Sequence, residues 1–308
     1  MGDTFDSRKG VDFSSLAWAK DNYYDRLKQM GCEVHTIVGN HTAYYKNTND
    51  VNSLTELLSQ KFNNVHIYAE AQEVDFDGFP ILLMPWINPQ NEIYALGMMD
   101  DTRADTMLGH LEIDGFQMYA GHESQGGLSK VEFQRFDTVM SGHFHHKSDD
   151  GHVYYLGTPY EIYWNDWGDP KGFHTFDLET RELEFIPNQY TMFEKIYYDD
   201  SKMDYVNSDI SKYDKKFVKI FVENRQDYFS FDKYLDRLYK EISVHDLKIV
   251  EDFSDLSADF VHDDIVEGAQ DTMSLLDKYV DEIETSLDKN KIKSKLKSLY
   301  VEAGDLEI

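Results

Sequence analysis

The chain has 308 residues, and 58 Asp and Glu against 30 Lys and Arg give it a formal net charge of −28. Hydrophobic residues make up 41% of the sequence, with only 18 Gly and 6 Pro, which excludes collagen-like and disordered classes. The length predicts about two domains of roughly 150 residues each. Because so acidic a surface repels phosphates, passive non-specific DNA binding is a poor first interpretation.

Targeting signals and cysteines narrow the expected location and metal chemistry. The sequence has neither an apolar run of about 18 residues nor the basic flank of a signal peptide. We therefore expect a cytoplasmic protein without membrane contact. The single cysteine, Cys32, excludes an internal disulfide and a cysteine-based zinc cluster, so any metal site must use His, Asp, Glu or Asn.

The first predicted elements are a helix and a strand. Residues 14–30 predict a helix, because apolar side chains recur every three to four positions at Leu16, Ala19, Tyr23, Leu27 and Met30. Ser14 or Ser15 is expected to cap its start. A largely β-branched run at 34–38 predicts a buried strand that stops at Gly39.

A second helix and a series of short strands follow. Ser53 and Glu56 form a capping-box pattern ahead of an apolar run, which predicts a helix start. Runs bounded by turn residues predict a hairpin that turns at Asp77-Gly78, a second hairpin over 173–186, and strands at 65–69, 81–86, 106–109, 138–141 and 153–156. The β–α–β order giving way to hairpins predicts an α/β fold with a layered mixed sheet that closes near Pro187.

The C-terminal third predicts a smaller unit and a helical tail. A polar segment at 197–216 is typical of a linker. A strand–helix–strand pattern predicts a small α+β capping unit, at 217–222, 231–242 and 247–250. Helical spacing of apolar residues over 271–300 predicts amphipathic helices. The expected domains are therefore 1–196, 197–262 and a tail at 263–308.

Four short segments share one design, in which an apolar strand stops at Gly and a metal-competent side chain follows. They are Gly2-Asp3, Gly39-Asn40-His41, Gly109-His110 and Gly142-His143-Phe144-His145. Loops at the carboxyl ends of neighbouring strands converge on one crevice. A carboxylate, an amide oxygen and imidazoles together suit Mn²⁺, Fe²⁺ or Zn²⁺. Two such ions about 3.5 to 4 Å apart clamp a phosphate and activate water, so the pattern indicates phosphoester hydrolysis.

Four ordered strings in this chain resemble the calcineurin-like metallophosphoesterases: GDTFDSRK, IVGNHT, MLGHLEIDGF and SGHFHH. Within that family they are most similar to the Mre11/SbcD nucleases, of the kind represented by the recombination endonuclease subunits of T4-like phages. YLGTPYEIYW, DPKGF and FIPN extend the resemblance through most of the chain. It implies a metal-dependent DNA exonuclease and endonuclease that acts at DNA ends in recombination, repair and replication, in the host cytoplasm.

The resemblance also implies a set of metal ligands. Asp3 would bridge two divalent ions, most favourably Mn²⁺ with Mg²⁺ as an alternative. The first ion would be completed by Asn40, His110 and His143, and the second would bind His145.

Three further residues have implied roles around these ligands. His41 would be the catalytic residue that protonates the leaving oxygen or stabilises the transition state, which suits an imidazole near neutral pH. Asp6 and Arg8 would orient the site or contact the phosphate, although a surface ion pair is an equally open interpretation. A turn cap is the alternative role for Asp3.

Two departures from the family pattern affect the expected activity. The family's first strand ends in Asp-x-His, and no such motif lies ahead of Asp3, so we expect the N-terminal strand of the sheet to be missing. Thr42 stands where many relatives have Asp, and an Asp there could orient His41. The alternatives to a nuclease are therefore a non-catalytic scaffold subunit of the same complex or a general metallophosphoesterase.

The other histidines are expected to be structural. His122, in YAGHES, competes with His110 for the fourth string, and we favour His110 because LEIDGF continues the family pattern. The remaining histidines lack a comparable context: His35, His66, His146, His152, His174, His245 and His262.

The tail is expected to bind a partner. The resemblance implies that this region docks on the coiled-coil base of a Rad50/SbcC-like ATPase, in an assembly that is homodimeric and binds DNA. Ile292, Leu296 and Leu299 form the apolar stripe that such a groove would cover. The net charge of −28 predicts that this subunit binds DNA poorly without its partner.

Overall fold

The computed structural model describes residues 1–119, 122–124 and 126–251, together with residues 280, 289, 291–293, 295 and 296. Its largest element is a six-stranded sheet with the order β11-β12-β10-β7-β6-β5. The strands are β5 Gln72–Phe76, β6 Phe79–Met84, β7 Thr106–Gly109, β10 Thr138–Ser141, β11 Ser148–Asp149 and β12 Val153–Tyr155. β6, β7, β10 and β12 are parallel, whereas β5 and β11 pair antiparallel at the two edges. The prediction of a mixed-sheet α/β fold is confirmed.

A β–α–β unit near the N-terminus continues this arrangement. β1 (Val34–Ile37) and β4 (Val65–Tyr68) pair in parallel, and α3 (Ser53–Leu58) lies between them in the chain. The small hairpin of β2 (Ala43–Tyr45) and β3 (Thr48–Asn52) precedes α3. The carbonyl of Val38, directly after β1, accepts a hydrogen bond from the amide of Trp86 at 2.8 Å. This bond places the end of β1 beside the end of β6.

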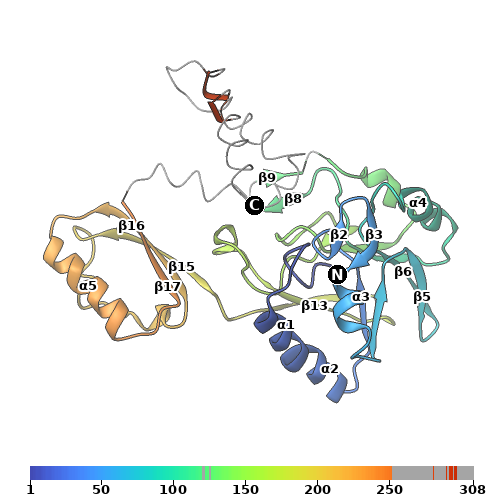
Figure 1. Ribbon diagram of the computed structural model, residues 1–308, viewed down its shortest axis with the longest axis horizontal. Helices are drawn as coiled ribbons and strands as arrows, with labels where there is room; N and C mark the ends of the chain where they lie inside the picture. The colour runs from blue at the N-terminus through green and yellow to red at the C-terminus, as the bar shows by residue number, and fades with distance from the viewer. Residues whose placement is uncertain are drawn as a thin grey trace.

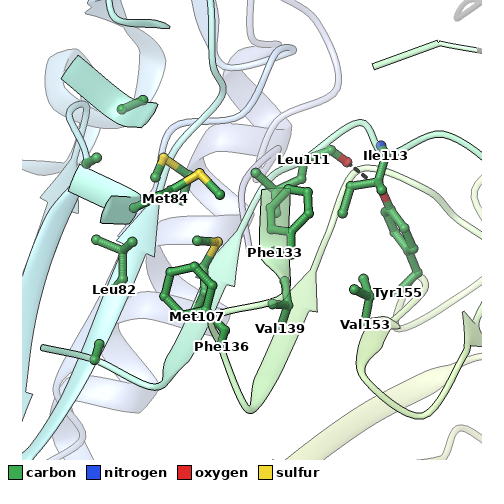
Figure 2. Packing of buried hydrophobic residues seen from close by; sticks show 14 of the residues in the cluster. Leu82, Met84, Met107, Leu111, Ile113, Phe133, Phe136, Val139, Val153 and Tyr155 are labelled. Atoms are coloured by element: carbon green, nitrogen blue, oxygen red, sulfur yellow. Dashed lines mark hydrogen bonds between the residues drawn. The ribbon is translucent and has the colours of Figure 1, made fainter. Parts of the chain in front are cut away.

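Alternating side chains of β6 supply the core on both faces of the sheet. Leu82 and Met84 are buried in one cluster, which also contains Met107 of β7 and Val139 of β10 (Figure 2). Ile81 and Leu83 are buried in a separate cluster with residues of β1 and β4. Because successive strand side chains point to opposite faces, a strand covered on both faces needs apolar residues at consecutive positions, which is why β6 ends in a continuous hydrophobic run over residues 81–84.

The predicted N-terminal helix forms, but its register changes halfway. α1 (Phe13–Ala19) passes into a π-helical turn (Lys20–Tyr24) and then into α2 (Asp25–Gln29). The extra residue of a π turn rotates the following side chains. Tyr24 is therefore buried at 1% exposure, whereas Tyr23, expected on the apolar face, is 50% exposed. Met30 is also exposed, so the predicted stripe is wrong at these two positions.

Both predicted helix caps are corrected, by two or three residues at the first helix and by one residue at α3. The carboxylate of Asp12 accepts hydrogen bonds from the backbone amides of Ser14 and Ser15, so neither serine is the cap. At α3 the side chain of Asn52, not Ser53, accepts from the amide of Thr55 at 2.9 Å. A short polar side chain two or three residues ahead of an amide can reach it, and several candidates in a row leave the choice to the backbone.

One helix was not predicted from the sequence. α4 (Glu92–Asp101) buries Ala95 and Met99 against the sheet. Its periodicity is obscured because large apolar side chains also point outward, with Ile93 at 89% and Tyr94 at 52% exposure. A helix with apolar residues on several sides gives little amphipathic signal.

The second half of the chain forms a hairpin and a separate three-stranded parallel sheet. β13 (Gly172–Phe176) and β14 (Leu183–Pro187) form the predicted hairpin. β15 (Phe193–Asp199), β16 (Phe217–Asn224) and β17 (Asp246–Val250) pair in that order, with α5 (Tyr228–Lys240) between the last two in the chain. Figure 1 shows this unit at the left, and the chain enters it from the β13–β14 hairpin at the start of β15.

The linker prediction for 197–216 is wrong at its start. β15 continues to Asp199 and pairs with β16, so the chain is strand, not linker, through that residue. The predicted division at 196/197 therefore falls inside a strand. Aromatic side chains explain this, since Tyr198 is buried at 1% in the core of the three-stranded unit.

The remaining short elements and the tail complete the description. They are β8 Gln117–Tyr119, β9 His122–Glu123 and the 3₁₀ turns Lys130–Phe133, Trp164–Asp166 and Ser211–Tyr213. Residues 291–293, 295 and 296 are helical, as predicted, and most of the predicted tail at 263–308 lies outside the described residues. Within the described part of the chain, no helix combines the length and apolar character that crossing a bilayer requires.

An ion pair at the edge of the large sheet gives a pH-dependent contribution to stability. Glu73 of β5 accepts from the hydroxyl of Thr102 at 2.7 Å and from Arg103 at 2.6 to 2.9 Å. These hydrogen bonds lower the pKa of Glu73 from 4.5 to about 2. A lowered folded-state pKa means that the ionised group stabilises the fold above about pH 4.5, and that this contribution is lost as pH falls toward 2.

We predict that Glu73→Gln lowers the unfolding midpoint at pH 7 by about 1 to 3 °C, because Arg103 is largely exposed and the pair is screened by water. The difference from the unsubstituted protein should shrink as the pH is lowered from 5 to 2. Thermal unfolding followed by circular dichroism at several pH values measures both. A difference that grows on acidification would contradict the assignment.

Candidate metal centre

The ends of three strands bring the candidate ligands together. Asn40 and His41 follow β1, His110 follows β7, and His143 follows β10. Backbone hydrogen bonds hold these ends in line, from the amide of His110 to the Met84 carbonyl at 3.0 Å and from Gly142 to the Gly109 carbonyl at 2.9 Å. Since the carboxyl ends of parallel strands share one edge of the sheet, side chains 70 and 103 residues apart meet there.

The ligand atoms of Asp3, His110 and His143 lie within 4.8 Å of one another. Asn40 joins them, because its Oδ1 lies 2.8 Å from His110 Nε2 and 3.1 Å from His143 Nδ1. The Oδ2 of Asp3 is 2.9 Å from the same Nε2. A carboxylate, an amide oxygen and two imidazoles therefore surround one point.

His110 decides what this point can hold. The side chain is buried at 1% exposure, and its Nδ1 donates to the carbonyl of Met1 at 2.8 Å, because a carbonyl oxygen can only accept. Its Nε2 then faces the acceptor oxygens of Asp3 and Asn40. Three acceptors can converge only on a proton or a cation. The donor set fits a divalent ion of the Mn²⁺ or Zn²⁺ type, with the Met1 carbonyl fixing the tautomer that coordinates through Nε2.

The charge of Asp3 is maintained by the imidazoles around it. Burial alone raises the pKa of Asp3, but the charge of His110 and its hydrogen bond outweigh burial, with smaller contributions from His41 and His143. The net result is a pKa well below the ordinary value. The second oxygen, Oδ1, accepts from the backbone amide of His41 at 2.8 Å. An ionised carboxylate held at both oxygens is ready to bind a cation.

Glycine and unusual backbone angles allow this close approach. A Cβ at Gly39 would overlap the carboxylate and amide of Asp3, and one at Gly2 would overlap the His110 ring. Asp3 and His143 themselves have φ of 48° and 76°, in the left-handed region that non-glycine residues rarely adopt. Such conformations cost about 1 to 3 kcal/mol each and persist only where surrounding contacts enforce them.

His41 lies beside the cluster with its own support. Its Nδ1 donates to the backbone carbonyl of Asp6 at 2.6 Å. Thr42, at the position where the family resemblance led us to expect Asp, is fully buried, and its hydroxyl accepts from the amide of Gly39 at 2.8 Å. The threonine thus closes the turn that presents Asn40 and His41. The orienting contact that an Asp at 42 was expected to give comes instead from the Asp6 backbone.

His145 and Asp6 are joined through a residue that sequence reasoning missed. The ring of Tyr163 stacks on that of His145, with centroids 5.6 Å apart and an interplanar angle of 4°. The Tyr163 hydroxyl donates to Asp6 Oδ1 at 2.8 Å. His145 is not part of the group formed by Asp3, His110 and His143 within 4.8 Å. Arg8 is half-buried in the segment that leads to α1.

Trp86 is a second residue that the sequence did not single out. Its ring lies 6.1 Å from that of His110 and 5.1 Å from that of His143, and it forms an apolar wall at the cluster. Trp86 comes two residues after β6, at the same sheet edge as the ligands. Only its position after a predicted strand could have indicated that Trp86 lies at the site. An aromatic residue after a strand is not by itself a metal-site pattern.

The histidines expected to be structural have partners outside the cluster. His35 stacks on His66, whose Nε2 lies 2.8 Å from a carboxylate oxygen of Glu33. His152 Nε2 donates to the carbonyl of Phe136 at 2.7 Å. His122 belongs to β9, whereas His110 lies in the cluster, as favoured from the sequence. His262 lies outside the described residues.

The fold and the cluster define a class of protein: a mixed-sheet α/β protein with a carboxylate, an amide and imidazoles gathered at the strand ends. No protein-family model matches the chain. The chain is 36% identical over 307 residues to exonuclease subunit 1 of Enterobacteria phage T4, covering 98% of this chain and 86% of that protein. It therefore belongs to the family of that nuclease subunit, the Mre11/SbcD type represented in T4-like phages.

We predict that Gly39→Ala weakens Mn²⁺ binding by about 10- to 100-fold, because the added Cβ displaces the Asp3 carboxylate. Overpacking at this point should lower the free energy of unfolding by about 1 to 3 kcal/mol. Gly97→Ala is the matched control, since a Cβ there meets nothing within 4 Å and lies inside α4. The control should keep Mn²⁺ affinity and gain about 0.5 to 1 kcal/mol. Titration calorimetry and chemical unfolding measure the two effects, and equal Mn²⁺ affinity in both variants would contradict the model of the site.

Proposed function

We propose that the protein is a metal-dependent DNA nuclease subunit that hydrolyses phosphodiesters at DNA ends during recombination, repair and replication. One observation carries this proposal: Asp3, Asn40, His110 and His143 converge on one point, in a chain that belongs to a nuclease-subunit family. The proposed cofactors are two divalent metal ions. Mn²⁺ is favoured over Mg²⁺ because the site offers nitrogen as well as oxygen ligands. When bound, such ions supply Lewis-acid polarisation of the phosphate and a nucleophile available near neutral pH.

The residues of the chain prepare the site for this chemistry. Asp3 offers an ionised carboxylate whose two oxygens are already oriented by His41 N and His110 Nε2. His145 would bind the second ion, at the side of the site where Tyr163 stacks. The Trp86 ring lies beside those of His110 and His143 and would help to shield them from water. The left-handed backbone of His143 is consistent with a conformation that is kept for a function.

His41 is the proposed catalytic residue. Its Nδ1 is committed to the Asp6 carbonyl, so Nε2 is the ring atom that would deliver a proton to the leaving oxygen or contact the transition state. A doubly protonated imidazole carries out this step best near neutral pH. Asp6 supports it in two ways, through its carbonyl and through the side-chain bond from Tyr163.

The acidity of the chain shapes how DNA is bound. A net charge of −28 opposes phosphate binding over most of the surface, so we propose that DNA affinity depends on a partner and on local cations. The proposed partner is a Rad50/SbcC-like ATPase that binds the helical tail. Ile292 and Leu296 are half-buried on this helix, and Leu299 lies outside the described residues. We also propose a homodimer, supported by exposed apolar side chains on the N-terminal helices, Phe13, Trp18 and Met30.

We predict that the purified protein with its partner and Mn²⁺ cleaves linear DNA, and that His41→Ala lowers kcat about 10²- to 10⁴-fold. Mn²⁺ binding should stay within about twofold, because His41 lies beside the cluster and contacts it through its backbone amide. Cleavage of end-labelled DNA and Mn²⁺ titration measure the two quantities.

His66→Ala is the control for this experiment, since His66 is paired with Glu33 away from the cluster. It should leave the cleavage rate unchanged. DNA that stays intact with unsubstituted protein, partner and Mn²⁺ present would contradict the nuclease proposal and favour a scaffold subunit. Faster hydrolysis of a generic aryl phosphate than of DNA would favour a general phosphoesterase.

We predict that Ile292→Ser with Leu296→Ser weakens binding of the ATPase by at least about tenfold, because two apolar side chains leave the interface. The control replaces Lys291 and Lys295, which are exposed on the same helix, with Ser. It should bind the partner within about twofold. Surface plasmon resonance measures the affinities, and equal losses in the two double variants would contradict docking through the apolar stripe.

A further inference from the structure

A group of buried charges lies next to the candidate metal centre, between the turn Trp164–Asp166 and β13. The Nζ of Lys171 is 2.8 Å from Asp166 Oδ1 and 2.8 Å from Asp169 Oδ2. Their side chains are 4%, 5% and 7% exposed, in that order. Asp169 also lies 2.8 Å from His146 Nδ1. Asp169 and Lys171 belong to the string DPKGF, which is part of the family resemblance but has no role assigned from the sequence.

The third hydrogen bond of Lys171 leads directly to the site. Its Nζ donates to the backbone carbonyl of His145 at 2.8 Å. The ammonium group has three donors, and these three acceptors use all of them. Lys171 is itself held in place through its own carbonyl, which accepts from the amide of Asn188 at 2.7 Å. The lysine therefore ties His145 to the hairpin of β13 and β14.

Asp166 holds the other half of the stacked pair. Its Oδ2 accepts from the backbone amides of Ile162 and Tyr163, at 2.8 and 2.9 Å. Burial by itself raises the pKa of Asp166, but Lys171 and these hydrogen bonds hold it below the ordinary value. One ion pair thus fixes the backbone of both residues whose rings stack, His145 and Tyr163.

The stacked rings connect this ion pair to the proposed acid. Tyr163 donates through its hydroxyl to the Asp6 side chain, and the Asp6 carbonyl accepts from His41 Nδ1. A shift of the Lys171 contacts would therefore move His145 directly and would reach His41 through Tyr163 and Asp6.

Stability alone does not explain a charge group at this depth. Replacing a buried ion pair by apolar residues of similar size is often neutral or stabilising, because desolvation opposes the attraction between the charges. A network of directional hydrogen bonds, in contrast, defines the positions of the backbone atoms it joins. The contacts made here are to the backbone of two residues at the site and not to the core.

We propose that Lys171, paired with Asp166, is a positioning residue that fixes His145 against Tyr163 at the edge of the candidate metal centre. The effect on cleavage rests on the proposed nuclease function, whereas the effect on the two rings does not. Lys171 touches neither the three clustered ligands nor His41 in any contact described above, so it acts through the His145 backbone.

The test reads the His145 ring in the full-length protein without metal. Histidine labelled at Cε1 gives one signal per ring in a proton–carbon spectrum, and His145→Gln identifies the signal of His145. The Tyr163 ring, parallel at 4°, shifts this signal through its ring current, and Tyr163→Leu gives its position without that effect. Lys171→Met should move the His145 signal most of the way to the Tyr163→Leu position.

A second variant covers the case in which Lys171→Met fails to fold, since it leaves two buried carboxylates without their cation. Lys171→Met with Asp166→Asn removes one positive and one negative charge together and should give the same signal shift. Lys216→Met is the matched control, because Lys216 is a half-buried lysine paired with Glu194 at 2.8 Å in the three-stranded unit. It should leave the His145 signal in place.

Cleavage of DNA with Mn²⁺ and partner gives a second measurement. Both Lys171 variants should lower kcat by about 10- to 100-fold, and KM should change little, since the residue orients a ligand and does not contact DNA. A folded Lys171 variant whose His145 signal is unmoved would overturn the positioning role, and so would an equal shift in Lys216→Met. Absence of cleavage by the unsubstituted protein would count against the proposed function only, because the ring signal still decides the role of Lys171.

Discussion

The structure depends on one constraint: His110 Nε2 faces the carboxylate of Asp3 and the amide oxygen of Asn40 in a place that water barely reaches. Acceptor atoms this close repel one another unless a proton or a cation lies between them. Glycines at the strand ends and left-handed backbone at Asp3 and His143 are what let the groups approach. The six-stranded sheet aligns the strand ends, and so the fold serves mainly to hold these few atoms together.

The ligand cluster is supported from two sides by different kinds of contact. On one side the ring of Trp86 packs against those of His110 and His143, and the strands β6 and β7 that precede these residues are anchored by buried apolar side chains such as Met84 and Met107 (Figure 2). On the other side charged groups around Lys171 hold the backbone of His145 and Tyr163. The apolar side gives stability in proportion to buried area, whereas the charged side gives position. Unpaired carboxylates near the site would add to the negative charge that opposes phosphate binding. Pairing Asp166 and Asp169 with Lys171 neutralises part of this charge and buries both carboxylates.

Much of the fold followed from local patterns. The hairpins at 77–78 and 173–186 and the strands of the large sheet were predicted because turn residues and apolar runs act over a few positions. The predictions were wrong where neighbouring residues compete for the same helix cap or the same core position. Asp12 and Asn52 displaced the predicted serine caps, and a π turn exchanged Tyr23 for Tyr24 in the core. The helix α4 gave no amphipathic pattern because its apolar residues face several directions.

The sequence by itself determined which residue types stand at the strand ends, since Gly followed by Asn, His or Asp is readable within three or four residues. Only the tertiary structure decided which of their atoms meet. His110 and Asn40 are 70 positions apart, Asn40 and His143 are 103 apart, and the carbonyl that sets the His110 tautomer belongs to Met1. Contacts over such separations depend on sheet register and loop closure, which no local pattern encodes. Trp86, Tyr163 and Lys171 gained their roles in the same way.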